Sequence, residues 1–498
     1  MQMSNASDKT MQLELIKVTP FINGESASST SEELLEVINP TNGKKLTDIP
    51  AGCDSDVGQA VASARLAFDD GRWSQLLPSQ RRALLHRFGD LIEEEASQLD
   101  ILDSLDMGKP LSVRLGNAVS AANYVRYCAD AIDKVMGDVY QSDHTTFITQ
   151  QRLPRGVVAA VVPWNFPTMS AALKFAPALA AGNCVVLKPS ECASQSAMRL
   201  VQLATQAGLP PGVLNMVPGR GDIVGRALAL HNDVDMMTFT GSTLVGKLMF
   251  QYAGKSNMKL VQAECGGKSP QIVFADFGDL DTVADNVAQL ILVNQGQLCV
   301  AGSRLLVQKE IEADLIEKVA IRLKAFVAGD PLDTKTTFGP LVNHQQLEKV
   351  LSYIASGRES GAELVCGGNR ILEDTGGYFV EPTLFANVSP DAKIAQEEIF
   401  GPVLSVSSFR DEEEAIQLAN STAYGLDTHV WTSNLSTGMK LSKYIRASMV
   451  SVYSAAPGGE GSGAMSTEPY GLSGVGVDGG QAGLETYLRR QVTWFNHG

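Results

Sequence analysis

The first part of the chain has the periodicity of amphipathic helices. Between residues 54 and 68, apolar side chains recur at intervals of three and four, which places them on one face of a helix. The apolar positions of this stripe are Val57, Ala60, Val61, Ala64 and Phe68. The spacing predicts a helix over 54–68 with Asp54 or Ser55 as its N-cap, and a second helix over 79–101. Residues 1–30 are expected to form a loose arm.

From residue 156 the pattern changes to short apolar runs that alternate with helical segments. The runs lie at 156–163, 184–189, 212–219, 234–242, 271–276, 303–308, 402–409, 428–433 and 448–453. Strands that alternate with helices in this way indicate βαβ units, whose strands form a parallel sheet. The chain is therefore predicted to be an α/β protein, with two α/β units that meet near residues 264–270.

Two segments do not fit this alternation. Residues 145–153 have the pattern of a strand with polar side chains on both sides, so this strand needs a partner outside the main sheets, and another subunit is one candidate. Residues 455–480 hold nine glycines in 26 positions, which predicts a mobile loop.

The composition narrows the class of protein without changing this picture. The chain has 498 residues, of which 44% are hydrophobic and 19% charged, as in packed globular proteins. The formal net charge is −15, so the chain repels phosphate backbones, and nucleic acid is not an expected partner. The most apolar region, 156–187, is interrupted by Asn165, Lys174 and Asn183. It is therefore expected to be buried core, and no membrane partner is expected.

The seven cysteines do not form a recognisable framework. Their number is odd, their spacings are wide and no CxxC pair occurs. A disulfide framework and a zinc site are therefore not expected, and we expect no bound metal. Free thiols favour a reducing compartment, so the cytoplasm is the expected location. One cysteine can be a nucleophile, but composition does not say which.

Two strings at predicted strand ends suit a dinucleotide. GSTLVG, residues 241–246, follows one strand and opens a helix whose free N–H groups favour phosphate. It lacks the middle glycine of GxGxxG, and a tight-turn glycine followed by a helix-packing glycine is an equally good interpretation. Lys188 and Glu191 follow another strand and suit ribose hydroxyls, and the alternative is a solvated turn. Glu191 would also repel a 2′-phosphate, which favours NAD over NADP.

Three further residues suit attack on a carbonyl compound. Asn165, in the string PWNFP, can donate its amide to an oxyanion, although an Asn that caps a turn has the same signature. Cys299, just after a helix predicted over 282–295, is a candidate nucleophile. Glu264, 35 residues earlier, is a candidate general base. The alternative for Cys299 is an inert buried thiol, and the alternative for Glu264 is a solvated carboxylate. Cys265 is a rival nucleophile because it adjoins Glu264.

Six strings occur together and in order: PWNFP, KPSE, FTGSTLVG, ECGGKSP, NQGQLC and EEIFGPV. Together they closely resemble the aldehyde dehydrogenase superfamily, and the resemblance extends from about Phe21 to about Trp431. The nearest likeness is the γ-glutamyl-γ-aminobutyraldehyde dehydrogenase-like branch. Each string alone is weak evidence, but their conjunction is specific.

The resemblance implies catalytic roles. Cys299 matches the family's nucleophile, Glu264 its general base and Asn165 its oxyanion-hole amide. Lys174 matches a lysine behind the site that helps to relay protons. The positions that match NAD-binding residues are Trp164, Lys188, Ser190, Glu191, Gly241, Ser242, Gly246, Glu398 and Phe400. The implied reaction oxidises an aldehyde to a carboxylic acid through a thiohemiacetal and a thioester, with hydride transfer to NAD and final hydrolysis.

The resemblance also implies an architecture. A Rossmann-like NAD-binding domain would comprise residues 1–138 and 156–265, and an α/β catalytic domain would comprise 266–465. A small bridging β flap would comprise 139–155 and 480–498. Flaps of this kind build homodimers or homotetramers.

The C-terminal region departs from the family's pattern, and this bears on the substrate. Tyr453 stands near where an Asn is expected, and Tyr470-Gly471-Leu472 replaces an aromatic-Gly-Gly loop. The residues expected to line the substrate pocket are Phe166, Met169, Leu173, Leu298 and Val300. This wall is apolar, and the helix predicted over 116–124 has no acid to meet an ammonium group, so we expect a medium or large, mainly apolar aldehyde. The alternatives are an aminoaldehyde, CoA-acylating chemistry, and a non-catalytic structural or binding protein.

Overall fold

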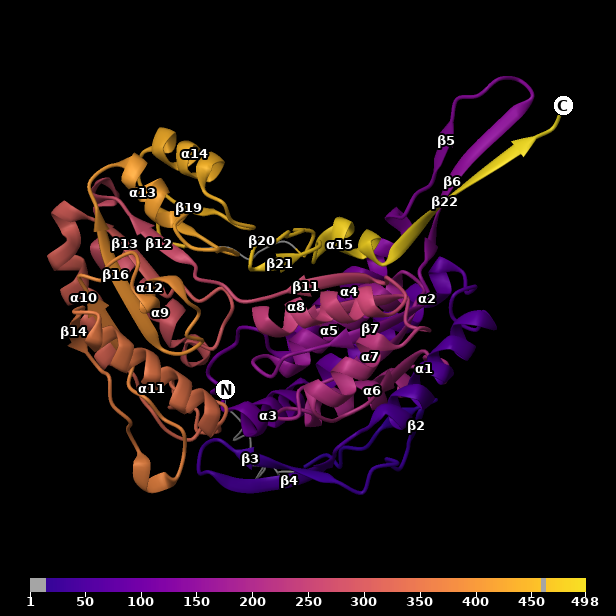
Figure 1. The fold of residues 1–498 in the computed structure, drawn as a ribbon, viewed down its shortest axis with the longest axis horizontal. Helices are drawn as coiled ribbons and strands as arrows, with labels where there is room; N and C mark the ends of the chain where they lie inside the picture. Colours follow the sequence, from indigo (N-terminus) through magenta and orange to yellow (C-terminus); the bar gives the residue numbers. More distant parts are fainter. Residues whose placement is uncertain (1–14, 458–462) are drawn as a thin grey trace, which may run out of the picture.

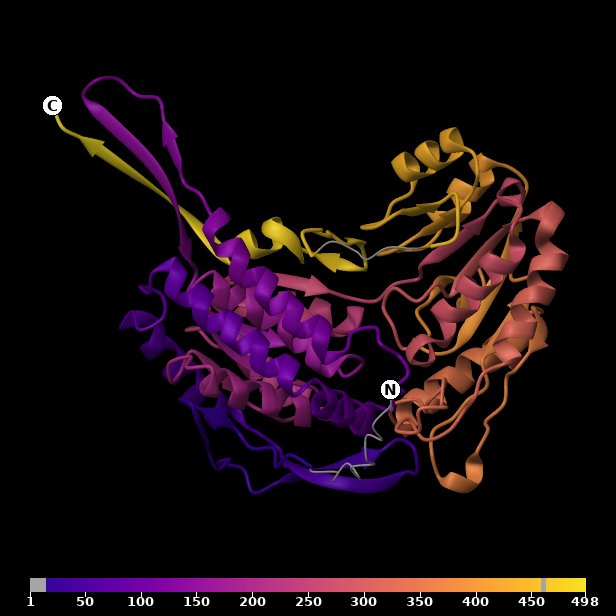
Figure 2. The same cartoon turned by 180° about the vertical axis from the view of Figure 1, so that it is seen from behind.

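Two large β-sheets form the body of the protein, and helices cover them (Figure 1). The computed structural model describes residues 15–457 and 463–498. A thin β flap extends away from both sheets, and it is equally visible from behind (Figure 2). These largely parallel sheets with covering helices confirm the predicted α/β class with a Rossmann-like unit.

The first sheet has eight strands and a parallel centre. In order across the sheet they are β2 (Glu25–Ser26), β1 (Phe21–Ile22), β9 (Leu214–Met216), β8 (Cys184–Lys188), β7 (Val157–Val161), β10 (Met236–Thr240), β11 (Leu260–Glu264) and β21 (Gly474–Val475). The five central strands, β9, β8, β7, β10 and β11, run parallel to one another, whereas β1 and β21 pair antiparallel with their neighbours. All residues of β7 and β8 are buried, which explains why both are continuous apolar runs.

The helices of this half follow the predicted alternation. They are α1 (Asp54–Asp69), α2 (Pro78–Glu94), α3 (Ala96–Met107), α4 (Ala118–Ala131), α5 (Pro167–Ala180), α6 (Gln195–Gln206), α7 (Arg226–Leu230) and α8 (Thr243–Lys255). The apolar region 156–187 forms β7, α5 and β8, so its prediction as buried core is confirmed. Within the described ranges, the structure has no helix that is both long enough and apolar enough to cross a membrane.

The second sheet has seven strands. Their order is β14 (Glu363–Cys366), β15 (Thr383–Ala386), β16 (Val403–Phe409), β13 (Arg304–Gln308), β12 (Pro270–Val273), β18 (His429–Trp431) and β19 (Ser451–Tyr453). All the pairs are parallel except β14 with β15. The helices of this half are α9 (Leu280–Leu292), α10 (Glu312–Lys324), α11 (His344–Glu359), α12 (Lys393–Gln396), α13 (Glu412–Ala419) and α14 (Leu435–Tyr444).

The flap is a three-stranded sheet made from two distant parts of the chain. Strand β6 (Thr146–Pro154) lies between β5 (Asp138–Tyr140) and β22 (Leu488–Asn496), which follows the short helix α15 (Gly480–Thr486). The antiparallel register pairs Gln150 with Val492. The predicted strand over 145–153 is confirmed by β6, and β22 lies within the 480–498 part of the expected flap.

The N-terminal segment is more ordered than predicted. Residues 1–14 lie outside the described residues, but Phe21 is buried and pairs with Met216 of β9. Strands β3 (Leu34–Asn39) and β4 (Lys44–Pro50) follow as a hairpin. The prediction of a loose arm is therefore wrong for the described part of 1–30.

Two helix boundaries also differ from their predictions. Helix α1 has Cys53 as its N-cap, one residue before the predicted positions, because the Asp56 carboxylate accepts the Cys53 N–H at 3.1 Å. The helix predicted over 79–101 is two helices with a break at Glu95, whose backbone has left the helical region.

The glycine-rich segment is only partly a loop. Residues 458–462 lie outside the described residues. Further on, β20 (Tyr470–Gly471) pairs with β17 (Tyr424–Gly425), and β21 pairs with β11. The prediction of a mobile loop over 455–480 is therefore wrong for these two strands.

Candidate active site

The predicted site residues gather at one edge of the eight-stranded sheet. Asn165 follows β7, Lys188 ends β8 and Gly241 follows β10. Glu264 is the last residue of β11. Parallel strands bring their carboxyl ends to the same edge, which is where open α/β sheets bind ligands. Cys299 reaches the site from the other half, in the loop before β13.

An irregular turn brings the Cys299 loop to Asn165. Helix α9 ends at Leu292, and Asn294 and Gln295 then adopt left-handed backbone, with φ of 48° and 57°. The Asn294 side-chain amide donates to the Asn165 carbonyl oxygen at 2.9 Å. The predicted helix end at Gln295 is therefore wrong, because left-handed residues cannot continue a right-handed helix.

The side-chain amide of Asn165 is held by the backbone just before Cys299. Its Nδ2 donates to the Gln297 carbonyl oxygen at 3.1 Å, and the residue is buried. A side-chain amide carries two N–H donors, so one remains for a ligand. This arrangement suits an oxyanion-hole donor.

Cys299 is the more accessible of the two cysteines that the sequence singled out. It is partly exposed, whereas Cys265 is buried with its Sγ against Gly246. Burial raises the pKa of the Cys299 thiol to about 12, and the carboxylates of Glu398 and Glu264 contribute to the increase. The thiol is therefore protonated at neutral pH unless a base or a positive charge approaches it.

Glu264 has the surroundings of a proton acceptor. Its Oε1 is buried and has no hydrogen-bond partner within the described ranges. The pKa of Glu264 is raised to about 8, mainly by burial and also by the Asp478 carboxylate, while Lys174 opposes the increase. A carboxyl group that titrates near neutral pH can take a proton from water and later release it.

Lys174 and Asp478 form an ion pair next to Glu264. Lys174 lies on α5 and is only 1% exposed. Asp478 also accepts a hydrogen bond from the Gln262 side-chain amide at 2.9 Å. The sequence analysis named Lys174 but missed Asp478, because no local pattern links a residue of the glycine-rich segment to α5.

The predicted ribose-binding residues form a local pair at the end of β8. Lys188 Nζ lies 3.1 Å from a carboxylate oxygen of Glu191 and donates to the Pro189 carbonyl oxygen at 3.0 Å. Ser190 is partly committed to this turn, since its hydroxyl accepts from the Cys192 N–H at 3.3 Å. The Lys188 and Glu191 side chains remain available for sugar hydroxyls.

Other predicted cofactor residues meet across the two halves. The rings of Trp164 and Phe400 make an edge-to-face contact with centroids 5.3 Å apart. One carboxylate oxygen of Glu398 accepts the Gly267 N–H at 3.1 Å. Trp164 and Phe400, which are 236 positions apart in sequence, therefore share one wall of the site.

The glycines of GSTLVG serve packing. A Cβ on Gly241 would lie 2.5 Å from the Phe239 ring, and a Cβ on Gly246 would lie 2.6 Å from Cys265 Sγ. Both distances are too short for a side chain, so helix-packing glycines are one correct interpretation of this string. Ser242 caps α8 through its side chain. The first-turn residue Leu244 is 72% exposed, so this helix N-terminus faces solvent.

The predicted substrate wall is assembled only in part. An apolar cluster near the nucleophile contains Phe166, Leu298 and Ala301, with Met169, Val293 and Val300 packed against it. Leu173 packs instead against the core of the eight-stranded sheet. The sequence analysis missed Ala301 and Val293, which lie on the same loop as Cys299.

Tyr453, which stands in place of an expected Asn, belongs to a separate cluster. Its hydroxyl lies 3.0 Å from His429 Nδ1, and His429 Nε2 lies 3.1 Å from an Asp427 carboxylate oxygen. The Tyr453 ring also packs on the Trp431 ring, with centroids 4.5 Å apart.

Comparison with known proteins identifies the family. The Aldehyde dehydrogenase family model matches residues 26–493. The NADP/NAD-dependent aldehyde dehydrogenase PuuC of Escherichia coli (strain K12) is 41% identical over 493 residues, covering 98% of this chain and 97% of that protein. The chain therefore belongs to the aldehyde dehydrogenase family and is an enzyme of that family.

Solved structures agree with this assignment. An indole-3-acetaldehyde dehydrogenase of P. syringae, in complex with NAD+ and IAA, is 46% identical with a TM-score of 0.93, covering 97% of each chain. A γ-glutamyl-γ-aminobutyraldehyde dehydrogenase from Burkholderia cenocepacia is 47% identical with a TM-score of 0.93, covering 98% of each chain. The resemblance to this branch is therefore confirmed at the level of fold and sequence.

Proposed function

We propose that this enzyme oxidises an aldehyde to a carboxylic acid, with NAD as the hydride acceptor and Cys299 as the nucleophile. The observation that carries the proposal is the convergence of three groups: the Cys299 thiol, the spare amide N–H of Asn165 and the unpartnered carboxylate oxygen of Glu264. The reaction consumes aldehyde, water and NAD+ and yields acid, NADH and one proton.

The first half of the reaction builds a thioester on Cys299. The Cys299 thiol first loses its proton to solvent. The sulfur then bonds to the aldehyde carbon, and the carbonyl electrons move to the oxygen, where the Asn165 amide stabilises the negative charge. The oxyanion then collapses and expels hydride. NAD supplies the hydride acceptor and, through its cationic ring, a positive charge that favours the thiolate.

The second half releases the acid. Glu264 takes a proton from water, and the resulting hydroxide attacks the thioester carbon so that the Cys299 sulfur leaves. Lys174 and Asp478 lie directly behind Glu264, where they can pass the proton onward. CoA-acylating chemistry would not need this base, so the buried Glu264 favours hydrolysis.

The residues present fit a dinucleotide. Lys188 and Glu191 offer a cation and a carboxylate to ribose hydroxyls, and the solvent-facing N-terminus of α8 offers free N–H groups to phosphate. Trp164, Phe400 and Glu398 would hold the nicotinamide end. Glu191 favours NAD over NADP, because a 2′-phosphate would place two negative groups together.

We propose a medium or large, mainly apolar aldehyde as the substrate. The cluster of Phe166, Leu298 and Ala301 supports it. The carboxylate nearest the start of α4 is Asp100, which accepts the Ala118 N–H at 2.9 Å and is therefore committed to the helix terminus. The indole-bearing substrate in the name of the P. syringae enzyme is of the same kind.

An aminoaldehyde is the second candidate, favoured by the name of the Burkholderia cenocepacia enzyme. A steady-state panel with hexanal, benzaldehyde, indole-3-acetaldehyde and ω-aminoaldehydes separates the two. We expect the apolar aldehydes to have the higher kcat/KM, and a preference for ω-aminoaldehydes contradicts the apolar assignment.

The reaction class is tested with the variant Cys299→Ala. We expect it to abolish NADH formation while NAD still binds, as followed by quenching of protein fluorescence. Turnover equal to that of the unmodified enzyme contradicts the mechanism. Acyl-CoA formation in the presence of CoA would indicate the acylating alternative, and absence of activity with every aldehyde would indicate a non-catalytic role.

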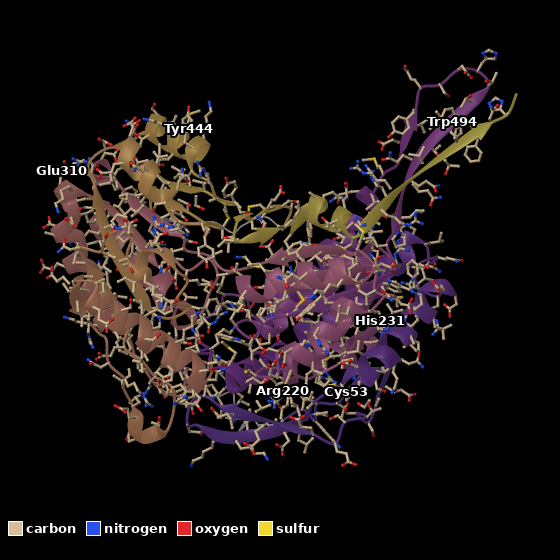
Figure 3. The ribbon with its side chains drawn as sticks, viewed as in Figure 1. Cys53, Arg220, His231, Glu310, Tyr444 and Trp494 are labelled. Atoms are coloured by element: carbon tan, nitrogen blue, oxygen red, sulfur yellow. The ribbon has the colours of Figure 1, made fainter. Side chains whose placement is uncertain are left out.

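The flap supports assembly into a homodimer or homotetramer. Its exposed apolar residues are Val139, Tyr140, Phe147, Val492, Trp494 and Phe495. Trp494 is 68% exposed and projects from the flap (Figure 3). Apolar side chains gathered on a protruding sheet are typical of subunit contacts. Light scattering after chromatography of Trp494→Glu is expected to show smaller particles than the unmodified enzyme.

The remaining assignments follow the same reasoning. We propose that 1–138 and 156–265 bind the cofactor, that 266–465 form the catalytic part and that 139–155 and 480–498 bridge subunits; the three corresponding sheets support this division. The seven free thiols support a cytoplasmic location.

A further inference from the structure

A short segment of the atypical C-terminal region runs across the junction of the two halves. This segment, Tyr470–Val475, is called the strap below. It contains β20 and β21, the latter being the edge strand of the eight-stranded sheet, and both lie on the side of that sheet that faces the second half (Figures 1 and 2). The proposed mechanism leaves the strap without a role.

On one side the strap binds the strand that carries Glu264. Strand β21 pairs Gly474 with Glu264 itself, and the Ser473 carbonyl oxygen accepts the Cys265 N–H at 2.7 Å. The Leu472 carbonyl oxygen accepts the Thr243 hydroxyl at 3.0 Å, in the first turn of α8. The strap therefore fixes both the proposed base and the helix that follows the proposed cofactor turn.

On the other side the strap binds the loop that borders Cys299. Strand β20 pairs with β17, and the Leu472 N–H donates to the Ala423 carbonyl oxygen at 2.8 Å. Leu426, which directly follows β17, packs against Gly267, and so does the Cys299 carbonyl oxygen. A shift of this loop would therefore displace Gly267, which the Cys299 backbone contacts.

Ser473 joins the two sides with a single side chain. Its hydroxyl oxygen accepts the Gly425 N–H at 3.0 Å, while its own carbonyl oxygen holds Cys265. Ser473 is completely buried, so no water can replace the hydroxyl without rearrangement. A buried N–H that loses its acceptor tends to shift until it finds another one.

We propose that Ser473 is a positioning residue that sets the separation between the Glu264 carboxylate and the Cys299 thioester. The inference rests on the proposed function, since it assumes those two roles. Ser473 touches neither substrate nor cofactor. It acts through the backbone of Cys265 on one side and of Gly425 on the other, so it governs hydrolysis of the thioester more than formation of NADH.

The test is pre-steady-state NADH formation by Ser473→Ala. We expect a burst of about one NADH per site, because the nucleophile is intact, followed by steady turnover that is roughly tenfold slower. The Kd for NAD and the burst rate constant should stay within about twofold of those of the unmodified enzyme. Ser421→Ala is the matched control, because its exposed hydroxyl also binds one backbone group, the Leu418 carbonyl.

A second variant guards against simple misfolding. Thr243→Val keeps the shape of the side chain and removes the hydroxyl, which bonds to the Leu472 carbonyl of the strap and to Tyr424 of the paired strand β17. We expect the same pattern with a smaller decrease. A steady rate that falls in proportion to the burst amplitude would mean fewer folded sites and would overturn the proposal. Unchanged steady turnover in both variants would overturn it as well.

The outcome is separable from that of the proposed function. If Cys299→Ala still turns over, the mechanism itself fails. If Cys299→Ala is inactive but Ser473→Ala and Thr243→Val keep the steady turnover of the unmodified enzyme, the mechanism stands and the positioning role is wrong.

Discussion

The ammonium group of Lys174 pairs with the carboxylate of Asp478, 304 residues further along the chain. The pair lies behind Glu264, whose pKa is influenced by both partners in opposite directions. Burying an ion pair brings little net stability, but removing one partner leaves a buried charge uncompensated. The pair therefore influences the pKa of Glu264, and loss of either partner would affect both stability and catalysis.

Replacing Asp478 tests this adjustment. Asp478→Asn removes a carboxylate that raises the pKa of Glu264 and leaves Lys174, which lowers it. We expect the pH profile of kcat to move to lower pH, and stability to fall by about 3–5 kcal/mol because Lys174 loses its partner. Rate profiles from pH 6 to 10 measure the first effect and urea denaturation the second. Asp478→Glu keeps the charge, so a shift of the same size in that variant would contradict the electrostatic explanation.

Replacing Glu264 separates the two halves of the reaction. Glu264→Gln should still give a burst of about one NADH per site, followed by turnover slower by about 10²–10⁴-fold, because general-base catalysis contributes that much. Rapid-mixing absorbance at the NADH band measures both. Glu310→Gln, an exposed change on the opposite half, should leave both unaffected (Figure 3). Loss of the burst would mean that Glu264 acts before hydride transfer.

The raised pKa of Glu264 also predicts how stability depends on pH. The folded-state pKa is about 8 and the ordinary value 4.5, so the folded protein binds the proton more tightly than the unfolded chain. The contribution of Glu264 to stability is therefore fully present below pH 4.5 and is lost as the pH rises to about 8. Glu264→Gln cannot lose a proton. Its free energy of unfolding relative to the unmodified enzyme should increase between pH 5 and 8.5, and a constant difference would contradict the assignment.

Asn165 is expected to affect the first half of the reaction. Asn165→Ala removes the amide that would stabilise the oxyanion, which should slow the NADH burst by about 10²–10³-fold. Binding of NAD should change little, because Asn165 bonds to the Cys299 loop and not to the Lys188 turn. Single-turnover kinetics and fluorescence titration measure these two effects. A normal burst rate would remove Asn165 from the oxyanion hole.

Glu191 is expected to set the choice of cofactor. Glu191→Gln keeps the size of the side chain and removes the charge that would repel a 2′-phosphate, so kcat/KM with NADP should rise about tenfold relative to NAD. Lys188 remains in place and can pair with the added phosphate. The ratio of kcat/KM values for the two cofactors is the measurement. An unchanged ratio would mean that other residues exclude NADP.

Much of the site was predictable because its residues occupy strand ends. Asn165 and Lys188 each follow or end a predicted apolar run, and the parallel arrangement that the alternation predicts then brings them to one edge. Strand β11, which ends at Glu264, was not among the predicted runs. Strand β6 of the flap was predictable as well, since a polar strand needs a partner outside the main sheets, whereas β22 was expected only from the family resemblance. Local pattern and chain order were sufficient for Asn165, Lys188 and β6.

The remainder depends on contacts that local pattern does not encode. The prediction extended α9 to Gln295, because helix propensity carries no signal for the left-handed turn that the Asn294 amide stabilises. Asp478 and Ser473 were missed for a related reason. A glycine-rich composition indicates a loop, but it does not indicate which distant strand will pair with that loop.

The two glycines after Cys265 have a consequence for how this enzyme can diversify. A Cβ on Gly266 would collide with the Glu398 carboxylate, and a Cβ on Gly267 would collide with the Cys299 carbonyl oxygen. At this crossing between the two sheets, alanine at 267 would therefore require the backbone at Cys299 to move, and alanine at 266 would displace the Glu398 carboxylate. New substrates have to be accommodated by the apolar side chains around Phe166, while this crossing stays the same through any such change.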